Sequence, residues 1–526
     1  MVFAEQLLNR LGHAPTPGQR KAIEALERLL ATSKSRSTLV LKGYAGTGKT
    51  TLVGALVKVL RAQGHPAILL APTGRAANVL SGYAHAPAST IHRRVYKVEG
   101  EEDGIGHMSV APNKDTDTLF VVDEASMIGT TGGGGDRLFQ DRNLLQDLAD
   151  HVFSGKGNRL LLIGDPAQLP PVGDERSPAL DVKVLREVHD LNAGSVELTE
   201  VVRQAEASGI LVNATALRSI LARYGEGEEK VVPVFALMKS EEDSSFKSQA
   251  SSLKPQVQSQ GTNNQQPTTS DQRPTTNNHQ PPTNFTDVTR MEGHDLQDAL
   301  ESAYGKHGQD SVCLICRSNK RAYLFNQQVR SRIMGYEEEL CAGDRLMVVK
   351  NNYYWAGQAG KPELIANGEP VEVLNVKGTE EKHGFRFAKL DVAWQTRDAA
   401  GGPERRELEV MVLLDVLTAD TPALPGPRMK ELSQAVLAGI VAKTRQARIK
   451  QLKDDPYVNA LQVKYAYAVT CHKAQGGQWP TVFVDQGYVT EEMIDAEYVR
   501  WLYTAVTRAS EKLYLLNFHP RFFGEE

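Results

Sequence analysis

Cysteine is scarce in this chain of 526 residues, which has only Cys313, Cys316, Cys341 and Cys471. Such low usage excludes a disulfide framework and favours a reducing compartment. Cys313 and Cys316 form a C-x-x-C pair, a spacing found in zinc and redox sites, but no second pair completes four zinc ligands. Because the pair lies in the apolar stretch SVCLICRS, we interpret both thiols as core side chains.

Long apolar runs are also missing. None reaches the roughly 18 residues that a membrane-spanning helix needs, and the opening MVFAEQLLNRLGHAP lacks a signal-peptide core. We therefore expect a cytoplasmic protein with no membrane partner. An excess of basic charge is missing too, since the net charge is -4. This value excludes a uniformly basic coat but permits a local basic groove for nucleic acid.

The strand-like runs indicate an α/β fold built from more than one unit. A chain of 526 residues is too long for a single core. Up to about residue 190, the runs STLVLKG, AILLAPT, TLFVVDEAS and NRLLLIGD alternate with helical patterns, which is typical of a parallel sheet with crossover helices. We assign residues 1–190 to this first unit, with a small hairpin insertion at 93–118. The glycine run at 129–136 predicts a loop.

The second half of the chain is interrupted twice. Residues 240–290 are rich in Gln, Asn, Thr, Ser and Pro, a composition that predicts a disordered tether with a possible role in binding a protein partner. Residues 344–460 contain β-rich runs with glycine turns, which favour a β-barrel-like insertion. The α/β pattern occupies 191–343 and resumes at 461–526, so we predict a second parallel-sheet unit carrying that barrel.

The stretch GYAGTGKTT matches the pattern of a phosphate-binding loop, G-x-x-x-x-G-K-[ST], between a predicted strand and a predicted helix. Its glycines let backbone N–H groups turn toward phosphate oxygens, and the helix N-terminus adds a positive dipole end. Lys49 is expected to reach the β and γ phosphates, and the Thr50 hydroxyl to coordinate Mg²⁺. The residues assigned to the nucleotide here are Gly43, Ala45, Gly46, Thr47, Gly48, Lys49, Thr50 and Thr51.

Further candidates for ATP hydrolysis follow other predicted strands. Asp123 and Glu124 end the run LFVVDE, so Asp123 is a predicted magnesium ligand and Glu124 a predicted base for the attacking water. Gln168, in GDPAQLPP, is placed to sense the γ-phosphate. Arg203 and Arg508, far apart in the sequence, are candidate arginine fingers. A finger from a second domain would make hydrolysis depend on closing a cleft.

The order of these motifs resembles superfamily 1 helicases, in particular the branch that contains RecD and Dda. The resemblance covers nearly the whole chain apart from the polar segment and the barrel-like insertion. It rests on the blocks TPGQRKAIEAL, GYAGTGKTT, APTGRAA, STIHR, VVDEASMI, GDPAQLPPV, LTEVVRQ, VTCHKAQGGQW and YTAVTRA, in family order.

The resemblance implies two RecA-like motor domains, a hairpin that serves as a pin, an SH3-like barrel insertion in the second domain, and 5′→3′ movement on DNA. It implies that Gln19 reads the adenine base. It also implies contacts to single-stranded DNA from two sets of residues. These are Pro72, Thr73, Arg75, Thr90 and His92 in the first domain, and Thr470, His472, Lys473 and Gln475 in the second.

The basic stretch at 443–453 can be interpreted in two ways. In one, its lysines and arginines neutralise phosphates along a DNA path; in the other, they form a solvated helix face.

The function expected from the sequence is an ATP-dependent DNA helicase, using ATP and Mg²⁺ and acting as a monomer on single-stranded and tailed or forked duplex DNA. Two alternatives remain open. One is an RNA helicase or a translocase that displaces proteins without unwinding. The other is an ATP-gated DNA-binding scaffold in a repair or defence complex. A nuclease is disfavoured because no second carboxylate cluster has metal-ligand spacing.

Overall fold

The computed structural model describes residues 3–99, 107–130, 142–202, 208–225, 231–237, 285–356, 364–397 and 402–525. The glycine run from residue 131 on, Arg203 and most of the polar segment at 240–290 lie outside these ranges. In the described parts of the chain, no helix is both long and apolar enough to span a membrane.

The first domain is a six-stranded, fully parallel sheet with the order β3-β2-β6-β7-β1-β8. Its strands are β1 (Ser37–Gly43), β2 (Ala67–Ala71), β3 (Ala88–Thr90), β6 (Leu119–Val122), β7 (Arg159–Gly164) and β8 (Asn192–Leu198). Their side chains alternate between two apolar layers, as the period of a strand requires: Leu39 and Leu41 enter one layer, and Val40 enters the other.

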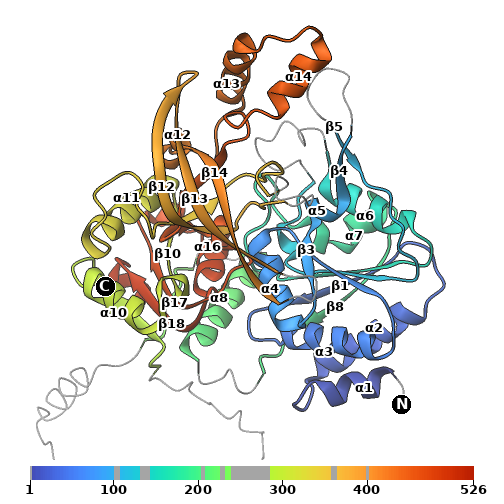
Figure 1. The fold of residues 1–526 in the computed structure, drawn as a ribbon. Coiled ribbons are helices and arrows are strands. Elements are labelled where there is room, and N and C mark those ends of the chain that lie inside the picture. The colour runs from blue at the N-terminus through green and yellow to red at the C-terminus, as the bar shows by residue number, and fades with distance from the viewer. Residues whose placement is uncertain are drawn as a thin grey trace, which may run out of the picture.

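Helices cover both faces of this sheet, as parallel sheets require (Figure 1). The layer on one face contains α1 (Phe3–Arg10), α2 (Pro17–Ala31), α3 (Lys49–Ala62) and α4 (Gly74–Ala84). The other contains α5 (Ile91–Val95), α6 (Leu144–Ser154) and α7 (Val182–Glu187). The predicted hairpin insertion is present as the antiparallel pair β4 (Tyr96–Glu99) and β5 (His107–Val110).

The second domain is a five-stranded parallel sheet with the order β16-β10-β17-β18-β9. Its strands are β9 (Val288–Met291), β10 (Val312–Cys316), β16 (Ala468–Thr470), β17 (Trp479–Asp485) and β18 (Ala509–Leu516). The helices around it are α8 (Gly209–Gly225), α10 (Leu296–His307), α11 (Asn319–Gln328), which continues as a π-helix at Val329–Ile333, α15 (Cys471–Ala474) and α16 (Ala496–Val506).

The two thiols of the C-x-x-C pair lie in β10 and are both buried. Cys313 packs into the apolar cluster that contains α16, and Cys316 into the cluster on the opposite face, with α10 and α11. Burial raises the pKa of both thiols. Among the described residues, no group of three or more His, Cys, Asp and Glu could hold a metal ion. The pair is therefore core packing.

The predicted barrel is present as five strands that close on themselves. They are β11 (Arg345–Val348), β12 (Pro370–Lys382), β13 (Phe385–Arg397), β14 (Pro403–Leu413) and β15 (Leu461–Tyr465). Trp394, 1% exposed, belongs to the apolar cluster that the barrel shares with the second sheet. Between β14 and β15 the chain forms α12 (Leu414–Thr418), α13 (Gly426–Gly439) and α14 (Arg445–Lys453). Figure 1 shows α13 and α14 projecting beyond the barrel.

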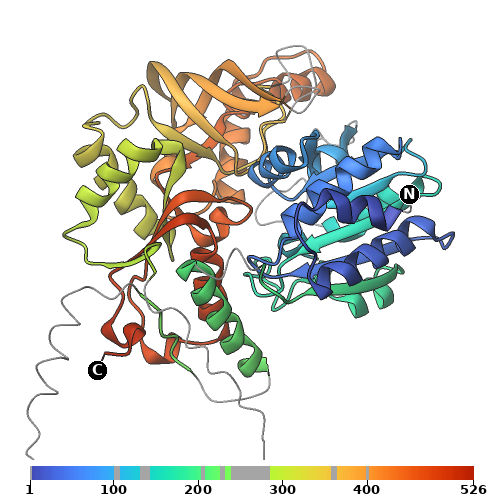
Figure 2. The ribbon, with the colours of Figure 1, turned by 90° about the horizontal axis from the view of Figure 1, so that it is seen from below.

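These observations confirm the predicted architecture of two parallel-sheet domains, a hairpin in the first and a barrel in the second. Figure 2 shows the first domain beside the second domain and its barrel. Two predicted boundaries differ from the strand pairing. The first unit was expected to end at 190, but β8 pairs with β1. The second unit was expected to resume at 461, but β15 closes the barrel.

The polar segment was expected to extend to 290. Its last residues are ordered, because Phe285 is 2% exposed and β9 pairs with β18. The large apolar side chains Phe285 and Val288 account for this difference, since they give the end of the segment something to bury.

Candidate nucleotide site and nucleic-acid surface

The phosphate loop connects β1 to α3. Gly46 and Gly48 adopt φ of 75° and 82°, values that favour glycine, and Gly48 is the N-cap residue immediately before α3. The Lys49 ammonium donates hydrogen bonds to the carbonyl oxygens of Gly43 (2.6 Å) and Tyr44 (2.9 Å). The loop thus has the turn that the motif predicts, with Lys49 folded across its mouth.

Other loop residues divide into buried and exposed ones. Thr47 is 0% exposed, and its hydroxyl donates to the Tyr44 carbonyl at 2.8 Å. Thr50 and Thr51, in the first turn of α3, are exposed. The Thr50 hydroxyl is therefore accessible to an ion, as its predicted role requires.

The two predicted carboxylates follow β6. Asp123 accepts a hydrogen bond from the Tyr83 hydroxyl of α4, and another from the Glu124 backbone N–H at 2.9 Å. Glu124 has φ of 51°, an unfavourable left-handed conformation for a residue with a side chain. Such backbone strain is typical of functional positions. Burial raises the pKa of both carboxyls, and the nearby Arg508 opposes that rise at Glu124.

Gln168 is only 6% exposed, and its side-chain oxygen has no hydrogen-bond partner within the described structure. Buried polar atoms nearly always have partners, so such an atom calls for an explanation. An amide oxygen that is free to accept is what the orientation of an attacking water requires.

Gln19 is completely buried, and both ends of its amide are already used. Its oxygen accepts from the Thr16 N–H at 3.1 Å, and its nitrogen donates to the Thr47 carbonyl at 3.2 Å. Thr16 and Gln19 form a capping box at the start of α2. The sequence spacing T-x-x-Q predicts this arrangement, and we did not interpret it in that way. The role of Gln19 in reading adenine stays a prediction.

Arg508 follows α16 of the second domain and faces the first domain. Its guanidinium is 4.0 Å from the Glu124 carboxylate, with the Arg508 side chain only 4% exposed. The guanidinium also donates to the carbonyl oxygens of Thr504 (3.0 Å) and Gly477 (3.3 Å), which fix its direction. The structure therefore brings Arg508 to the predicted catalytic base, across the domain boundary. Arg203 lies outside the described residues.

The loop at 165–169 of the first domain is held by the second domain. Arg500 donates to the Pro166 carbonyl at 2.6 Å, and the Thr504 hydroxyl accepts from the Leu169 N–H at 2.9 Å. Gln475 donates to the Leu169 carbonyl at 2.9 Å. Leu169 also packs in the apolar cluster of the second domain. Gln475, predicted to contact DNA, thus lies in the domain interface, and its DNA role stays a prediction.

Sequence reasoning missed Arg500, Tyr503 and Thr504 as interface residues. A signal was available, because Arg500 and Thr504 are four residues apart and share one face of a helix, and Arg508 follows four residues later. We call Arg500, Tyr503, Thr504 and Arg508, with their partners in the first domain, the α16 contact.

The DNA-contact residues predicted in the first domain gather where strands end and helices begin. Thr73 caps α4 by accepting from the Ala76 N–H, and Thr90 caps α5 by accepting from the Arg93 N–H, both at 3.2 Å. Pro72 follows β2 directly, and His92 lies against Tyr96 with ring centroids 5.7 Å apart.

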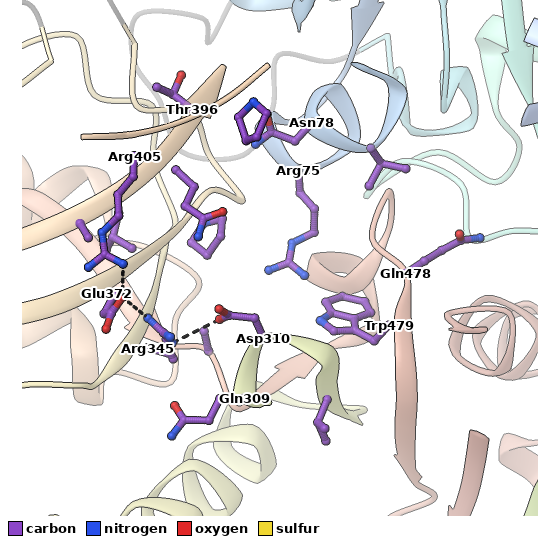
Figure 3. Close-up of a pocket in the computed structure, with 18 of the residues that line it drawn as sticks. Arg75, Asn78, Gln309, Asp310, Arg345, Glu372, Thr396, Arg405, Gln478 and Trp479 are labelled. Carbon is purple, nitrogen blue, oxygen red and sulfur yellow. Dashed lines mark ion pairs between the residues drawn. The ribbon is translucent and has the colours of Figure 1, made fainter. Parts of the chain in front are cut away.

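Arg75 points elsewhere, into a cavity of about 440 Å³ between α4, the second sheet and the barrel (Figure 3). Its guanidinium lies 4.5 Å from the centre of the Trp479 ring. Burial lowers the pKa of Arg75. On the far side of the cavity, Arg345 pairs with Glu372 at 2.7 Å and with Asp310 at 3.2 Å. The contact of Arg75 with DNA stays a prediction.

The corresponding residues of the second domain lie on β16 and α15. Thr470 ends β16, His472 is exposed, and burial, together with nearby Lys464, lowers the pKa of Lys473 to about 8. The two predicted sets approach each other at Gly476. A Cβ at that position would be 3.4 Å from the Thr73 hydroxyl oxygen. Thr73 therefore faces the loop that follows α15.

Comparison with known proteins finds similarity to helicases over parts of the chain. Residues 15–220 match the family described as AAA domain, and residues 465–516 match the UvrD-like helicase C-terminal domain. The chain is 35% identical over 180 residues to the ATP-dependent RecD2 DNA helicase of Deinococcus radiodurans, covering 34% of this chain and 21% of that protein. It is 30% identical over 160 residues to the ATP-dependent DNA helicase dda of Enterobacteria phage T4, covering 30% of this chain and 33% of that protein.

The matched region thus spans only about a fifth to a third of these relatives. A solved Pif1 helicase from Bacteroides, in complex with ADP-AlF3 and ssDNA, covers 96% of this chain and 93% of its own. Its identity is 13% and its TM-score 0.42, a likeness too distant to support an assignment.

The fold and the motif set resemble those of superfamily 1 helicases: there are two parallel-sheet domains, and each contains a region that matches one of the two family models. The similarity of its matched region to RecD2 and Dda confirms the resemblance predicted from the motifs.

Proposed function

We propose that this protein is an ATP-dependent DNA helicase that moves 5′→3′ along single-stranded DNA and unwinds duplex DNA. The observation that carries the proposal is the Arg508 guanidinium of the second domain, 4.0 Å from Glu124 of the first. A charge supplied across a domain boundary makes hydrolysis depend on the approach of the two domains. That dependence is what converts a hydrolysis cycle into movement.

The residues present fit ATP and Mg²⁺. When bound, ATP with Mg²⁺ supplies the phosphoryl group whose transfer to water releases free energy. Lys49 and the loop amides would hold its phosphates, while Thr50 and Asp123 would hold the ion. Glu124, next to Asp123 and 4.0 Å from the Arg508 guanidinium, suits a base for the attacking water. The unpaired oxygen of Gln168 suits an acceptor for the attacking water.

The proposed DNA path runs over the edge where Thr73 and Thr90 cap their helices and onto β16 and α15. Hydroxyl groups and helix N-termini suit the sugar-phosphate backbone and carry no sequence information. The preference for DNA rests on the similarity to RecD2 and Dda, whose names state that they are DNA helicases. The direction of movement rests on the motif resemblance alone. We propose a monomeric motor in the cytoplasm.

Tailed duplexes test the proposal. Purified protein with ATP and Mg²⁺ should unwind a duplex with a 5′ single-stranded tail and leave one with a 3′ tail paired. Lys49→Ala should lose ATPase and unwinding but retain binding to single-stranded DNA. ATPase stimulated by RNA alone would favour an RNA helicase, and ATPase without strand separation a translocase. A Lys49→Ala variant with wild-type ATPase would show that the phosphate assignment is wrong.

A further inference from the structure

Tyr503 belongs to α16 of the second domain, yet both partners of its hydroxyl lie in the first. The hydroxyl oxygen accepts a hydrogen bond from the Ala45 N–H of the phosphate loop at 2.9 Å. The hydroxyl donates to the Asp165 carboxylate at 2.6 Å. Tyr503 is only 1% exposed. A single hydroxyl therefore joins the phosphate loop to the loop at 165–169.

Asp165 in turn connects this hydroxyl to Lys49. One of its oxygens accepts from the Ala167 N–H at 2.9 Å. The other, which accepts from Tyr503, is also 3.9 Å from the Lys49 ammonium, and the Asp165 side chain is only 2% exposed. Tyr503 and Lys49 thus share one buried carboxylate oxygen. A hydrogen bond to a carboxylate satisfies part of its charge, so the hydroxyl weakens the hold of Asp165 on Lys49.

A second tyrosine of the same helix shows that burial alone does not explain this arrangement. Tyr498 is 3% exposed, and its hydroxyl accepts from the Gln486 amide at 3.2 Å, within its own domain. Burial raises the pKa of both tyrosines, so both remain protonated near neutral pH. The two residues differ in the domain to which their hydroxyls are bound.

We propose that Tyr503 is a positioning residue that reports the approach of the second domain to the phosphate loop. With the domains together, the Tyr503 hydroxyl accepts a hydrogen bond from the Ala45 N–H and donates one to Asp165, so Asp165 attracts Lys49 less strongly and Lys49 can bind a phosphate. With the domains apart, Asp165 loses the Tyr503 hydrogen bond and attracts the Lys49 ammonium more strongly. Domain approach would then raise the affinity for nucleotide. The inference deepens the proposed function and rests on it.

The test compares Tyr503→Phe with Tyr498→Phe, a matched loss of one hydroxyl from the same helix. The first readout needs no nucleotide: hydrogen exchange of the peptide that contains Ala45. We expect exchange about tenfold faster in Tyr503→Phe, as for the loss of one hydrogen bond to a charged network, and no change in Tyr498→Phe. Equal exchange in both variants and the wild type would overturn the proposal.

The second readout is ATPase activity stimulated by single-stranded DNA. Tyr503→Phe should raise the KM for ATP about tenfold and change kcat less than about threefold, because ground-state positioning is lost. Asp165→Asn, which keeps an acceptor for Tyr503, provides a second variant should Tyr503→Phe fold poorly, and it should lower that KM. A KM unchanged in both would overturn the proposal. A wild-type protein without ATPase would contradict the proposed function, while the exchange measurement still decides the role of Tyr503.

Discussion

Two of the contacts between the second half of the chain and the first domain differ in chemistry. At the α16 contact, charged and hydrogen-bonding side chains meet across the boundary, as with Arg508 and Glu124 at 4.0 Å. The other contact brings the barrel loop at 366–369 against the start of α4, and we call it the barrel-loop contact. There the Gly74 N–H faces the Asn367 carbonyl at 3.4 Å, and a Cβ at Gly74 would lie 2.3 Å from Glu369.

The difference shows which contact can control chemistry. Separation of the domains at α16 would leave several buried polar groups without partners, and it would remove a cation from the phosphate site. Separation at the barrel loop would release one close backbone approach. We therefore expect the α16 contact to couple domain movement to hydrolysis, and the barrel-loop contact to affect how closely the barrel approaches Thr73.

The largest effect is expected at the α16 contact. Arg508→Ala should lower the DNA-stimulated kcat for ATP about a thousandfold or more, because the cation at Glu124 is lost. Steady-state ATPase assays measure this effect. Arg428→Ala, which removes an exposed ion pair with Glu431 on α13, is the control and should change kcat less than about twofold. A comparable loss in both variants would mean that Arg508 acts through folding and not through the site.

A pH-dependent effect is expected at the barrel-loop contact. Glu369 accepts hydrogen bonds from the Ala366 N–H and the Trp394 indole, both at 2.9 Å. Burial raises its pKa from 4.5 to about 7, opposed by these bonds and by nearby Arg93. A carboxyl whose pKa rises on folding binds a proton more tightly when folded, so its contribution to stability falls as the pH rises from about 4.5 to 7.

Glu369→Gln removes this titration and keeps the acceptor. We expect it to raise the free energy of unfolding by about 2–3 kcal/mol at about pH 8 and to change it little at about pH 5. Thermal unfolding at the two pH values measures the difference. Stabilisation of equal size at both values would show that the carboxyl is ionised throughout, and the predicted pKa would be wrong.

The sequence predicts those features of the site whose conformation depends on residues close together in the chain, and it misses those that depend on residues far apart. The phosphate loop follows from the strand-loop-helix pattern around Lys49, because nearby residues determine its conformation. The α16 contact depends on which helix face meets the other domain. Arg508 could be predicted as an arginine finger from the chemistry of phosphoryl transfer, whereas Tyr503 was missed. The hydrogen bond between Gln475 and Leu169 spans 306 residues of sequence. No local pattern carries such information.

A smaller effect is expected from a methyl group at the barrel-loop contact. Gly74→Ala should destabilise the protein by about 1–2 kcal/mol, because Glu369 is hydrogen-bonded and cannot easily yield to the new Cβ. Gly426→Ala is a matched control, since Gly426 also begins a helix, α13, and a Cβ there would have nothing within 4 Å. It should be neutral or stabilising. Denaturant unfolding measures the difference in the free energy of unfolding between the two variants. Equal values would mean that the barrel loop at 366–369 moves away from the new methyl group without cost.

The smallest effect is expected at α14, which takes part in neither contact. None of its residues is buried, and Figure 1 shows it beyond the barrel strands. Its basic side chains face solvent or contact α13: Arg448, for example, donates a hydrogen bond to the Leu437 carbonyl of α13 at 2.8 Å. Removing the exposed lysines of α14 and of the residues just before it, with Lys450→Ala and Lys443→Ala, should therefore change stability by less than about 0.5 kcal/mol and the affinity for single-stranded DNA by less than about twofold. Titrations of DNA binding over a range of salt concentrations measure this. Each lysine bound to a phosphate contributes about one to the slope of log affinity against log salt. A slope reduced by about two in the double variant would therefore mean that both lysines bind DNA phosphates and that α14 lies on the DNA path.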